Sequence, residues 1–370
     1  MDHIIKFRSN STIREVMEGV LKSKYGIVLI IDENDNLVAT MTDGDMRCAV
    51  LDNLDLKQSV INIIENQKKL PFKSPITASL ETSRSELISI MDKYGINHIP
   101  LVDNNNKVRK LSVREELQNL NLKLSHAIIM AGGRGERLRP LTDKIPKPML
   151  PIKNKPLLEH IILMLKAAGI KNIQITLRYK SEYIRKYFEN GSKFGVDISY
   201  ISESIPLGTA GFLKMINIKN STLVLNGDVL TNLNFNSFFY YHKRNKATMT
   251  VAVHPYITNV PYGVLKMKGD IPFGPSYKCM EVVSLEEKPK LQFFINAGVY
   301  ILEPQILNYL PDTDFFNMTD VINAIVSNKL RVASFPLYGY WKDIGNLDDY
   351  EKVPNDIKNV CFNVETFNDN

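Results

Sequence analysis

The stretch Ala131-Gly-Gly-Arg-Gly-Glu-Arg-Leu-Arg-Pro-Leu-Thr-Asp-Lys-Ile-Pro-Lys-Pro-Met-Leu-Pro151 decides the fold of this chain of 370 residues. It follows a short apolar run, 127–130, that is typical of a buried parallel strand, and it precedes an amphipathic helix. A glycine-rich turn at the carboxyl end of a strand presents backbone N–H groups to a phosphate. Four cationic side chains belong to the same block: Arg134, Arg137, Arg139 and Lys147. The pattern predicts a site for the phosphates of a nucleoside triphosphate.

The spacing of the block excludes two commoner phosphate loops. It contains no Gly-Lys-Ser/Thr, so it is not a Walker A loop. Gly133-x-Gly135 is followed by Arg137 and Leu138 rather than by a third glycine, which fits a dinucleotide fingerprint poorly. An ordinary surface loop would not need the glycines, the arginines and Pro-Lys-Pro in one ordered block.

The block resembles the signature of the sugar-1-phosphate nucleotidyltransferases, G-G-x-G-x-R-L-x-P-L-T-x-x-x-P-K-P-x-L-P. Every fixed position of it is present from Gly132 to Pro151, and the resemblance extends more loosely to about residue 350. It implies a reaction that joins a nucleoside triphosphate to a sugar 1-phosphate and releases pyrophosphate. It also implies a Rossmann-like, mostly parallel sheet of the nucleotide-diphospho-sugar transferase type.

Alternating strand and helix patterns after Ser125 favour the same α/β fold. Strands are expected at 172–177, 197–201 and 222–226, and helices at 157–165, 181–189 and 209–216. This order predicts a mostly parallel sheet with helices on both faces. Ligands in such sheets lie beyond the carboxyl ends of the strands.

Length and composition indicate a soluble chain of two domains. Hydrophobic residues make up 44% of the chain and charged residues 23%, and the formal net charge is +6. The cations are scattered among acids without a basic stripe, which argues against a nucleic-acid partner and suits small phosphorylated substrates. Because we find no leader and no segment able to span a bilayer, we expect no membrane association and a cytoplasmic location. The three cysteines show neither metal-ligand spacing nor a disulfide framework.

Residues 1–120 contain a weak internal repeat. Each unit reads as a helix, two strands and a closing helix, and Asp32 and Asp103 mark equivalent turns. A constant offset with the same element order predicts duplicated units that share a buried face. We therefore expect a first domain at 1–120, a second at 125–350 and a C-terminal tail at 351–370.

The repeated half resembles a pair of CBS domains, modules that usually bind adenine nucleotides in the clefts between repeats. In that family the pattern Thr/Ser-x-x-Asp contacts a ribose, and Thr42 and Asp45 match it. The second unit departs from the pattern, with Ser112 and Glu115. The resemblance implies an adenine nucleotide as a ligand, and the alternative is a packing and dimerisation module without one. Since CBS pairs often pair face to face, we expect a homo-oligomer.

Two aspartates are candidate metal ligands. Asp228 follows the apolar run 222–226, where a carboxylate can hold Mg²⁺ against triphosphate oxygens, although aspartate is also common in such turns. Asp343 lies in the aromatic and glycine-containing segment 340–345. The family that the chain resembles carries a metal-binding aspartate at each of these positions. The resemblance therefore implies Mg²⁺ held by Asp228 and Asp343.

The resemblance also implies two sets of substrate residues. The set for the nucleoside triphosphate is Ala131, Gly132, Gly133, Arg134, Gly135, Arg178, Gly208 and Thr209. The set for the sugar phosphate is Gly263, Glu287, Lys288 and Asn296. Many relatives have Val-Asn-Tyr where this chain has Leu177-Arg178-Tyr179, and the arginine could pair with O6 and N7 of guanine, with an acidic side chain or with solvent.

The implied reaction needs positioning and charge neutralisation rather than a side-chain base, because the attacking phosphate oxygen is already anionic. Arg137 and Lys147 are the expected catalytic cations. A CBS pair ahead of such a domain resembles guanylyltransferases that make GDP-amino sugars, including the glucosamine-1-phosphate enzymes of legionaminic acid biosynthesis. GTP and glucosamine 1-phosphate are therefore the expected substrates. Mannose 1-phosphate, CTP or dTTP are the alternatives within the class, and a non-catalytic nucleotide sensor or a scaffold for a partner is the alternative outside it.

Overall fold

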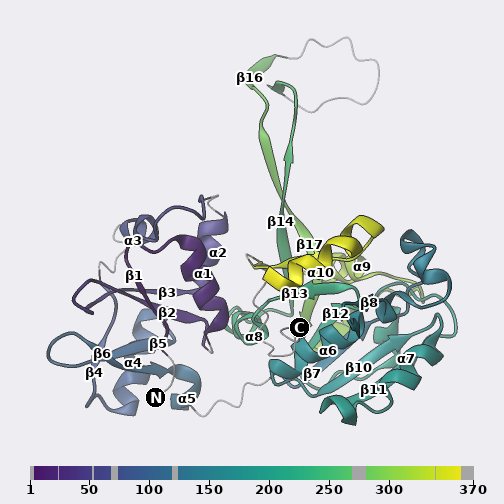
Figure 1. Cartoon of the computed structure of the whole chain (residues 1–370), viewed down its shortest axis with the longest axis horizontal. Helices are drawn as coiled ribbons and strands as arrows, with labels where there is room; N and C mark the ends of the chain where they lie inside the picture. The colour runs from purple at the N-terminus through teal and green to yellow at the C-terminus, as the bar shows by residue number, and fades with distance from the viewer. Residues whose placement is uncertain are drawn as a thin grey trace.

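The computed structural model describes residues 4–23, 25–51, 54–67, 74–118, 124–268, 281–337 and 339–359. These residues form two bodies that lie side by side, with a long β-arm rising from the larger one (Figure 1). The smaller body is N-terminal. The larger α/β body contains the phosphate loop.

Two units of the same design make up the smaller body. The first consists of β1 (Lys6–Arg8), α1 (Ile13–Lys22), β2 (Ile27–Ile31), β3 (Leu37–Thr42), α2 (Asp43–Leu51) and α3 (Ile61–Gln67). The second consists of β4 (Ala78–Ser79), α4 (Arg84–Tyr94), β5 (His98–Val102), β6 (Val108–Val113) and α5 (Arg114–Gln118). Each unit has a three-stranded sheet, and capping boxes at Thr12 and Ser83 begin the equivalent helices α1 and α4. The predicted repeat is therefore visible in the structure.

A seven-stranded sheet of order β11-β10-β7-β12-β17-β14-β18 forms the centre of the larger body. Its strands are β7 (His126–Met130), β10 (Asn172–Leu177), β11 (Asp197–Ser202), β12 (Thr222–Asn226), β14 (Met249–Asn259), β17 (Lys290–Leu302) and β18 (Val332–Pro336). All neighbours pair in parallel except β17, which runs antiparallel to both β12 and β14. The expectation of a mostly parallel sheet is confirmed.

Helices cover both faces of this sheet, because successive side chains of a strand point to opposite sides. On one face Ile129 and Leu225 share a core with α6 (Leu157–Ala167), α7 (Ser181–Phe188), α8 (Phe235–Arg244) and α10 (Leu347–Asn359). On the other face Ile128 and Val224 share a core with α9 (Met318–Ser327) and the 3₁₀ helix η5 (Gly211–Met215). The helix expected at 209–216 is shorter in the structure, where it is the 3₁₀ helix η5, and Thr209 lies before it with its N–H bonded to Oδ1 of Asn317.

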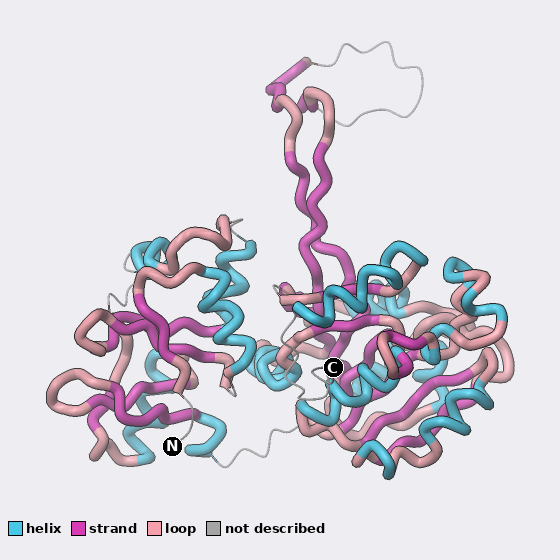
Figure 2. Tube along the Cα trace, viewed as in Figure 1, coloured by secondary structure: helices cyan, strands magenta, loops and turns pink. Residues whose placement is uncertain are grey.

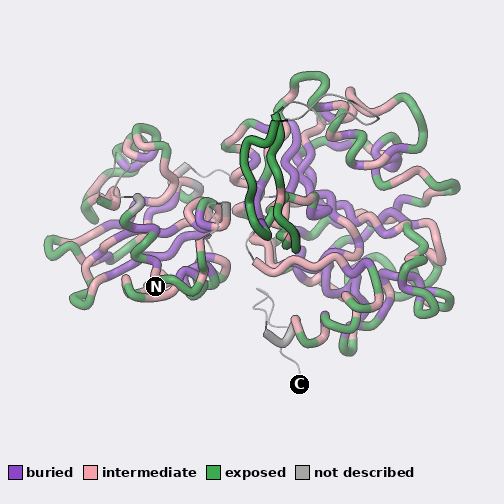
Figure 3. Tube along the Cα trace, turned by 90° about the horizontal axis from the view of Figure 1, so that it is seen from above, coloured by how far each residue is buried: buried purple, intermediate pink, exposed green. Residues whose placement is uncertain are grey.

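β14 and β17 continue past the sheet and form, with β15 (Val264–Met267) and β16 (Val282–Glu286), a two-stranded arm that the sequence patterns had not predicted. We define the arm as residues 254–267 and 282–296. Its long strands pair continuously from His254–Ile295 to Asn259–Lys290, and β15 pairs with β16 beyond them. Figure 2 shows loops between these two ladders, and in Figure 3 the arm is exposed along most of its length.

The remaining elements are short. β8 (Pro151–Ile152) pairs with β9 (Lys155–Pro156), and β13 (Val229–Thr231) pairs with β19 (Trp341–Asp343). α10 extends past residue 350 into the segment expected as a tail, of which 360–370 lie outside the described residues. Residues 119–123, at the predicted domain boundary, also lie outside them. Among the residues that the structure describes, no helix combines the length and apolar character needed to cross a membrane.

Candidate active site

The phosphate loop follows β7, which lies between β10 and β12 in the middle of the parallel strands. Gly135 has a φ of 66°, and a Cβ at this position would lie 2.9 Å from Cβ of Lys147. Glycine is required there by both the left-handed backbone and the close approach of the lysine. Gly133 faces open space, since a Cβ there would meet nothing within 4 Å. The loop therefore leaves room above its backbone for a ligand.

Lys147 is held directly beside this loop. It begins the 3₁₀ helix η3 (Lys147–Met149), it is 9% exposed, and its Nζ lies 2.5 Å from Oδ2 of Asp228. An ammonium group buried to this extent would be costly without a charged partner. The pair therefore fixes a cation at the carboxyl ends of β7 and β12.

The ladder between β13 and β19 brings Asp228 and Asp343 together. Val229 pairs with Asp343, and the N–H of Ile344 donates to the carbonyl of Asp228 over 3.0 Å. Oδ1 of each aspartate is buried and has no hydrogen-bond partner in the part of the chain that the structure describes. Burial and the charge of Asp228 raise the pKa of Asp343, against the opposing effect of Lys147 and Arg137. Two such oxygens would be stabilised by a bound cation.

The donor set fits a Mg²⁺ ion that is shared with a substrate. Among the described residues, no group of three or more His, Cys, Asp or Glu side chains could hold a metal ion. Mg²⁺ keeps several waters and is usually bound by one or two carboxylates plus substrate phosphates. Asp228 and Asp343 therefore match what Mg²⁺ needs from a protein when a triphosphate supplies the other oxygens. The presence of Mg²⁺ stays a prediction.

Arg137 lies on the same side of the site as Asp343. It belongs to the 3₁₀ helix η1 (Glu136–Leu138), and its two terminal guanidinium nitrogens would lie 3.5 Å from a Cβ at Gly345. The segment around Gly345, although distant in sequence, thus packs against Arg137. Arg134 is more than half exposed and faces Glu136 at 3.9 Å, so it lies at the rim rather than in the centre.

A cavity of about 330 Å³ opens beside the loop. The residues from the predicted sets that line it are Ala131, Gly132, Gly133, Lys147, Arg178, Gly208, Thr209 and Asp228. Of the predicted nucleotide residues, Arg134 and Gly135 do not line it. Most of the predicted nucleotide residues therefore line one cavity together with Lys147 and with Asp228, one of the two candidate metal ligands.

Glu203 shares this cavity with Arg178 and was missed by the sequence analysis. Oε2 of Glu203 and Cβ of Arg178 would lie 3.5 and 3.6 Å from a Cβ at Gly132, so both side chains flank the glycine loop. Burial raises the pKa of Glu203, and the positive charge of Arg178 lowers it. Glu203 directly follows β11, and the carboxyl ends of parallel strands are where ligand-facing residues gather. That position was the signal that could have identified it.

Gly208 and Thr209 line the cavity and also contact the segment that begins α9. Gly208 has a φ of 79°, and a Cβ there would lie 2.3 Å from the carbonyl oxygen of Phe316. The Thr209 N–H donates to Oδ1 of Asn317 over 3.1 Å, and its hydroxyl accepts from the N–H of Met318 over 3.0 Å. Both residues therefore dock the start of α9 against the cavity wall. Asn317, a further lining residue, was not predicted.

The predicted sugar-phosphate residues are not all brought to this site. Asn296 lies at the base of the arm, where its Oδ1 accepts from the N–H of Gly298 over 3.0 Å. Gly263, Glu287 and Lys288 lie together on the arm, since a Cβ at Gly263 would be 2.9 Å from Oε2 of Glu287. None of these residues lines the nucleotide cavity, and Figure 1 shows the arm rising away from the sheet. Within one chain, the two predicted substrate sets are separated.

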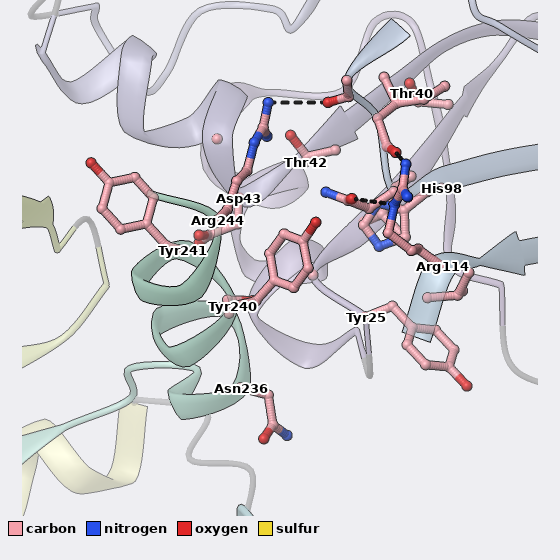
Figure 4. Close-up of a pocket in the computed structure, with 18 of the residues that line it drawn as sticks. Tyr25, Thr40, Thr42, Asp43, His98, Arg114, Asn236, Tyr240, Tyr241 and Arg244 are labelled. Carbon is pink, nitrogen blue, oxygen red and sulfur yellow. Dashed lines mark hydrogen bonds between the residues drawn. The ribbon is translucent and has the colours of Figure 1, made fainter. Parts of the chain in front are cut away.

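A second cavity, of about 240 Å³, lies between the two bodies (Figure 4). Both repeat units line it, with Thr42, His98 and Arg114 among their residues, and Tyr240 and Arg244 of α8 line it from the larger body. Arg244 donates to the carbonyl of Gly95 over 3.0 Å. The cavity is therefore closed by residues of both bodies.

The two predicted CBS ligand residues have different places at this cavity. Thr42 lines it, whereas Asp45 does not. The Asp45 carboxylate accepts from the N–H and the hydroxyl of Thr42 over 2.7 and 2.6 Å. The backbone N–H of Asp45 donates in turn to the Thr42 hydroxyl. This reciprocal bonding is a capping box at the start of α2, which is a structural role for the motif.

Three arginines line the cavity between the bodies, and two of them are paired: Arg47 with Asp43 and Arg114 with Asp92. Burial raises the pKa of Tyr240, while the nearby charges of Arg244 and Arg114 lower it, so two guanidinium groups act on one hydroxyl. Burial lowers the pKa of His98 to about 4, which keeps its ring neutral at physiological pH. Figure 4 shows Tyr240 reaching from α8 toward the residues of the repeat units.

Comparisons with known proteins agree with this geometry. The nucleotidyl transferase family model matches residues 126–360, and the CBS domain model matches residues 68–110. The chain is 31% identical over 258 residues to the UTP–glucose-1-phosphate uridylyltransferase of Synechocystis sp., covering 63% of this chain and 65% of the relative. It is 30% identical over 236 residues to the mannose-1-phosphate guanylyltransferase of Mycobacterium tuberculosis, covering 62% and 64%. The chain thus spans less than two thirds of these relatives' length.

A solved structure gives the same picture of the fold. The Bacillus anthracis protein assigned as a glucose-1-phosphate thymidylyltransferase superposes with a TM-score of 0.51 and 20% identity, over 66% of this chain and 99% of that one. The family model covers more than half of the chain, including the phosphate loop, both aspartates and the seven-stranded sheet. The chain belongs to the nucleotidyl transferase family.

Proposed function

We propose that the chain transfers a nucleoside monophosphate from a nucleoside triphosphate to a sugar 1-phosphate. One observation carries the proposal: a buried lysine is paired with an aspartate at the end of a phosphate loop, and a second aspartate lies beside them with an unpartnered oxygen. A reaction between two anionic substrates needs cations and metal ligands in this arrangement. The named activities of the two relatives, uridylyl and guanylyl transfer to sugar 1-phosphates, support the same class.

The bond changes require no side-chain base. A phosphate oxygen of the sugar 1-phosphate attacks the α-phosphorus, and a new P–O bond forms. The bond from the α-phosphorus to the bridging oxygen breaks, and pyrophosphate leaves with the electron pair. Lys147, beside both the loop and Asp228, would offset the negative charge that the two substrates bring together. Arg137 would hold the departing pyrophosphate.

Asp228 and Asp343 would hold Mg²⁺, which would supply charge neutralisation at the α-phosphate when bound. Their unpartnered Oδ1 atoms support this assignment. The Lys147 ammonium holds Oδ2 of Asp228, which leaves its Oδ1 for the ion. The metal site and the catalytic cation would then share one carboxylate.

GTP is the proposed nucleotide, and two side chains of the cavity support this choice. Guanine offers O6 and N7 as acceptors and its N2 amino group as a donor. Arg178 can donate to the acceptors, and Glu203 can accept from the donor, and both flank the glycine loop. Glucosamine 1-phosphate is the proposed sugar, supported by the resemblance of the CBS-fused architecture. Mannose 1-phosphate with GTP, or a sugar phosphate with CTP or dTTP, are the competing substrate pairs.

The cavity between the bodies is the proposed site of an adenine nucleotide. Arg244 would pair with a phosphate, Arg114 lies nearby in an ion pair with Asp92, and Thr42 lines the same cavity. α8, which provides Arg244, begins shortly after β13, and β13 directly follows Asp228. A ligand held against α8 would therefore act on the segment that carries a proposed metal ligand.

Pyrophosphate release tests the proposed function. The full chain is incubated with Mg²⁺ and each pairing of GTP, CTP, dTTP, UTP or ATP with glucosamine, mannose or glucose 1-phosphate. Turnover with one pair, fastest for GTP and glucosamine 1-phosphate, is the expected result. GTP binding without turnover for any pair, with and without added adenine nucleotide, would overturn the transferase assignment and favour a nucleotide sensor.

A further inference from the structure

Phe315 is an exposed aromatic side chain in the wall of the nucleotide cavity. It lines this cavity, and 59% of it is accessible to solvent. Its neighbour Phe316 is 1% exposed and belongs to the core that contains Ile128 and Val224. Two successive phenylalanines therefore lie in opposite environments, one in the core and one at the cavity. Core packing accounts for Phe316, but it does not account for Phe315.

The backbone that carries Phe315 is held on both sides of this residue. The Nζ of Lys214 donates to the carbonyl of Thr313 over 2.9 Å, and the Thr313 hydroxyl donates to the carbonyl of Phe315 over 3.2 Å. The N–H of Phe316 donates to the carbonyl of Leu207 over 3.1 Å. An aromatic ring on a backbone that is already fixed loses little conformational freedom when a ligand binds to it.

The same contacts connect Phe315 to Glu203, one of the two residues proposed to contact the base. The Glu203 carboxylate is hydrogen-bonded to the backbone N–H of Leu207. The carbonyl of Leu207 accepts in turn from the N–H of Phe316. Leu207 alone thus links Glu203 to the peptide bond between Phe315 and Phe316. Glu203, Leu207 and Phe315 also line the same cavity.

The strand order places this part of the cavity away from the phosphates. Asp228 follows β12, the glycine loop follows β7, and Glu203 follows β11, with β10 between β7 and β11. Neighbouring strands are about 4.8 Å apart, so the ends of β12 and β11 are separated by roughly 14 Å. A nucleotide with its phosphates at the glycine loop and Asp228 therefore directs its base toward Glu203 and Phe315.

We propose that Phe315 is a nucleobase-binding residue, whose ring stacks on the face of the base while Glu203 and Arg178 contact its edge. The proposal rests on the proposed function for the identity of the ligand. A nucleobase is flat and has a π-face that stacks on aromatic side chains. Stacking would cover the ring that the free chain leaves exposed. Edge contacts and face contacts would then fix the base in two directions.

Isothermal titration of Phe315→Ala tests the proposal with two ligands, GTP and inorganic tripolyphosphate, each with Mg²⁺. The affinity for GTP should fall about 5- to 100-fold, the usual effect of removing one aromatic side chain from a base stack. The affinity for tripolyphosphate, which has no base, should stay unchanged. Phe293→Ala is the matched control, because Phe293 is a phenylalanine of similar exposure, 52%, on the arm. Unchanged GTP affinity in Phe315→Ala, or an equal loss for both ligands, would overturn the proposal.

Two further variants separate stacking from simple apolar contact. Phe315→Trp keeps an aromatic ring, whereas Phe315→Leu keeps an apolar side chain without one. GTP affinity should be retained in the tryptophan variant and reduced in the leucine variant. Wild-type affinity in Phe315→Leu would show that no stacking is needed, and the proposal would fail. Because Phe315 is mostly exposed, all three variants should melt near the wild-type temperature. If Phe315→Ala melts lower, the comparison of tryptophan with leucine decides the outcome.

Proton NMR of GTP gives a readout that is independent of turnover and so separates this proposal from the proposed function. Without any sugar phosphate present, the ring current of Phe315 should shift the guanine H8 signal upfield on binding, and the shift should be lost in Phe315→Leu. The shift in a chain that turns over no sugar phosphate would support stacking and count against the proposed function. Turnover by wild type, with equal H8 shifts in wild type and Phe315→Leu, would support the proposed function and overturn the stacking.

Discussion

Nζ of Lys147 lies 2.5 Å from Oδ2 of Asp228, while Oδ1 of the same carboxylate is buried without a hydrogen-bond partner among the described residues. One oxygen is held by a cation of the chain, and the other is left for a cation that comes from outside. Asp343, brought alongside by the β13–β19 ladder, offers a second oxygen of the same kind. Mutations should therefore separate the role of the lysine from the role of the metal.

Lys147→Ala should reduce kcat/KM about 100- to 1000-fold, the usual effect of losing one preorganised cationic or hydrogen-bonding group at a reacting centre. The loss should fall on kcat more than on KM for the nucleotide, because glycine-loop contacts remain. Lys144→Ala is the matched control, since Lys144 is an exposed lysine of the same loop. Steady-state pyrophosphate release measures both. Equal activity of the two variants would remove Lys147 from the mechanism.

Asp343→Asn should abolish turnover and yet stabilise the metal-free chain. Burial and Asp228 raise the pKa of Asp343, so its charged form is disfavoured in the folded state. Removing that charge should raise the melting temperature in EDTA at pH 7, and the gain should vanish as the pH falls below about 4, where aspartate is protonated in the unfolded chain as well. Mn²⁺ binding followed by electron paramagnetic resonance should be weakened in the variant. Unchanged Mn²⁺ affinity would show that Asp343 is not a metal ligand.

Arg178 and Glu203 should set the choice of nucleobase. Arg178→Ala and Glu203→Gln should each lower the preference for GTP over UTP by about 10- to 100-fold, the usual value of one good bidentate base contact. The measurement is the ratio of kcat/KM values for the two nucleotides with one sugar phosphate. Arg134→Ala, at the rim, should leave that ratio unchanged. A uniform loss with all nucleotides would mean that the pair supports the loop rather than reading the base.

Arg244→Ala should weaken adenine-nucleotide binding between the bodies about tenfold. Its guanidinium lines the cavity from α8, whereas Lys186, the matched control, is exposed on α7. Isothermal titration with AMP, ADP and ATP measures the effect, and turnover of GTP and the sugar phosphate without added adenine nucleotide should be unaffected. Binding that is equally tight in Arg244→Ala and Lys186→Ala would confine the ligand site to the repeat units.

The central sheet could be predicted because its determinants are local. Apolar runs at 127–130, 172–177 and 222–226, each followed by a turn, predict parallel strands without knowledge of any contact, and the structure has strands there. The glycine loop and Lys147 could be predicted for the same reason, since they belong to one block. Asp343 was identified through family resemblance, and its place beside Asp228 depends on a ladder between segments more than a hundred residues apart.

The arm could not be predicted by the same means, and the sequence analysis missed Glu203. Polar and apolar residues alternate in the strands at 249–259 and 290–302 no more clearly than in ordinary strands. Their extension past the sheet depends on how far the two strands pair with each other. Glu203 lies directly after a strand, which marks a candidate position, but its significance comes from Arg178, which flanks the same glycine loop. The motif Thr42-x-x-Asp45 is a local pattern with two possible meanings. It was interpreted as a ligand contact, and in the structure the two residues cap a helix.

Glu303→Gln should destabilise the chain without touching the active site. The Glu303 carboxylate accepts from His242, Lys243 and Ser221 over 2.8, 2.6 and 2.8 Å. Burial alone would raise its pKa, but these donors outweigh burial and lower the pKa from 4.5 to about 2. A lowered carboxylate pKa contributes stability that is present above about pH 4.5 and is lost as the pH falls toward 2.

The expected loss in Glu303→Gln is about 2–3 kcal/mol at neutral pH, and the difference from wild type should shrink steadily below pH 4.5. Urea unfolding at a series of pH values measures it, with Glu351→Gln on the exposed side of α10 as the control. Turnover should persist, because Leu302 pairs with Thr222 at the end of β12 opposite to Asp228. A stability difference that does not change with pH would mean that the glutamine disturbs packing, and that the three donors do not hold a charged Glu303.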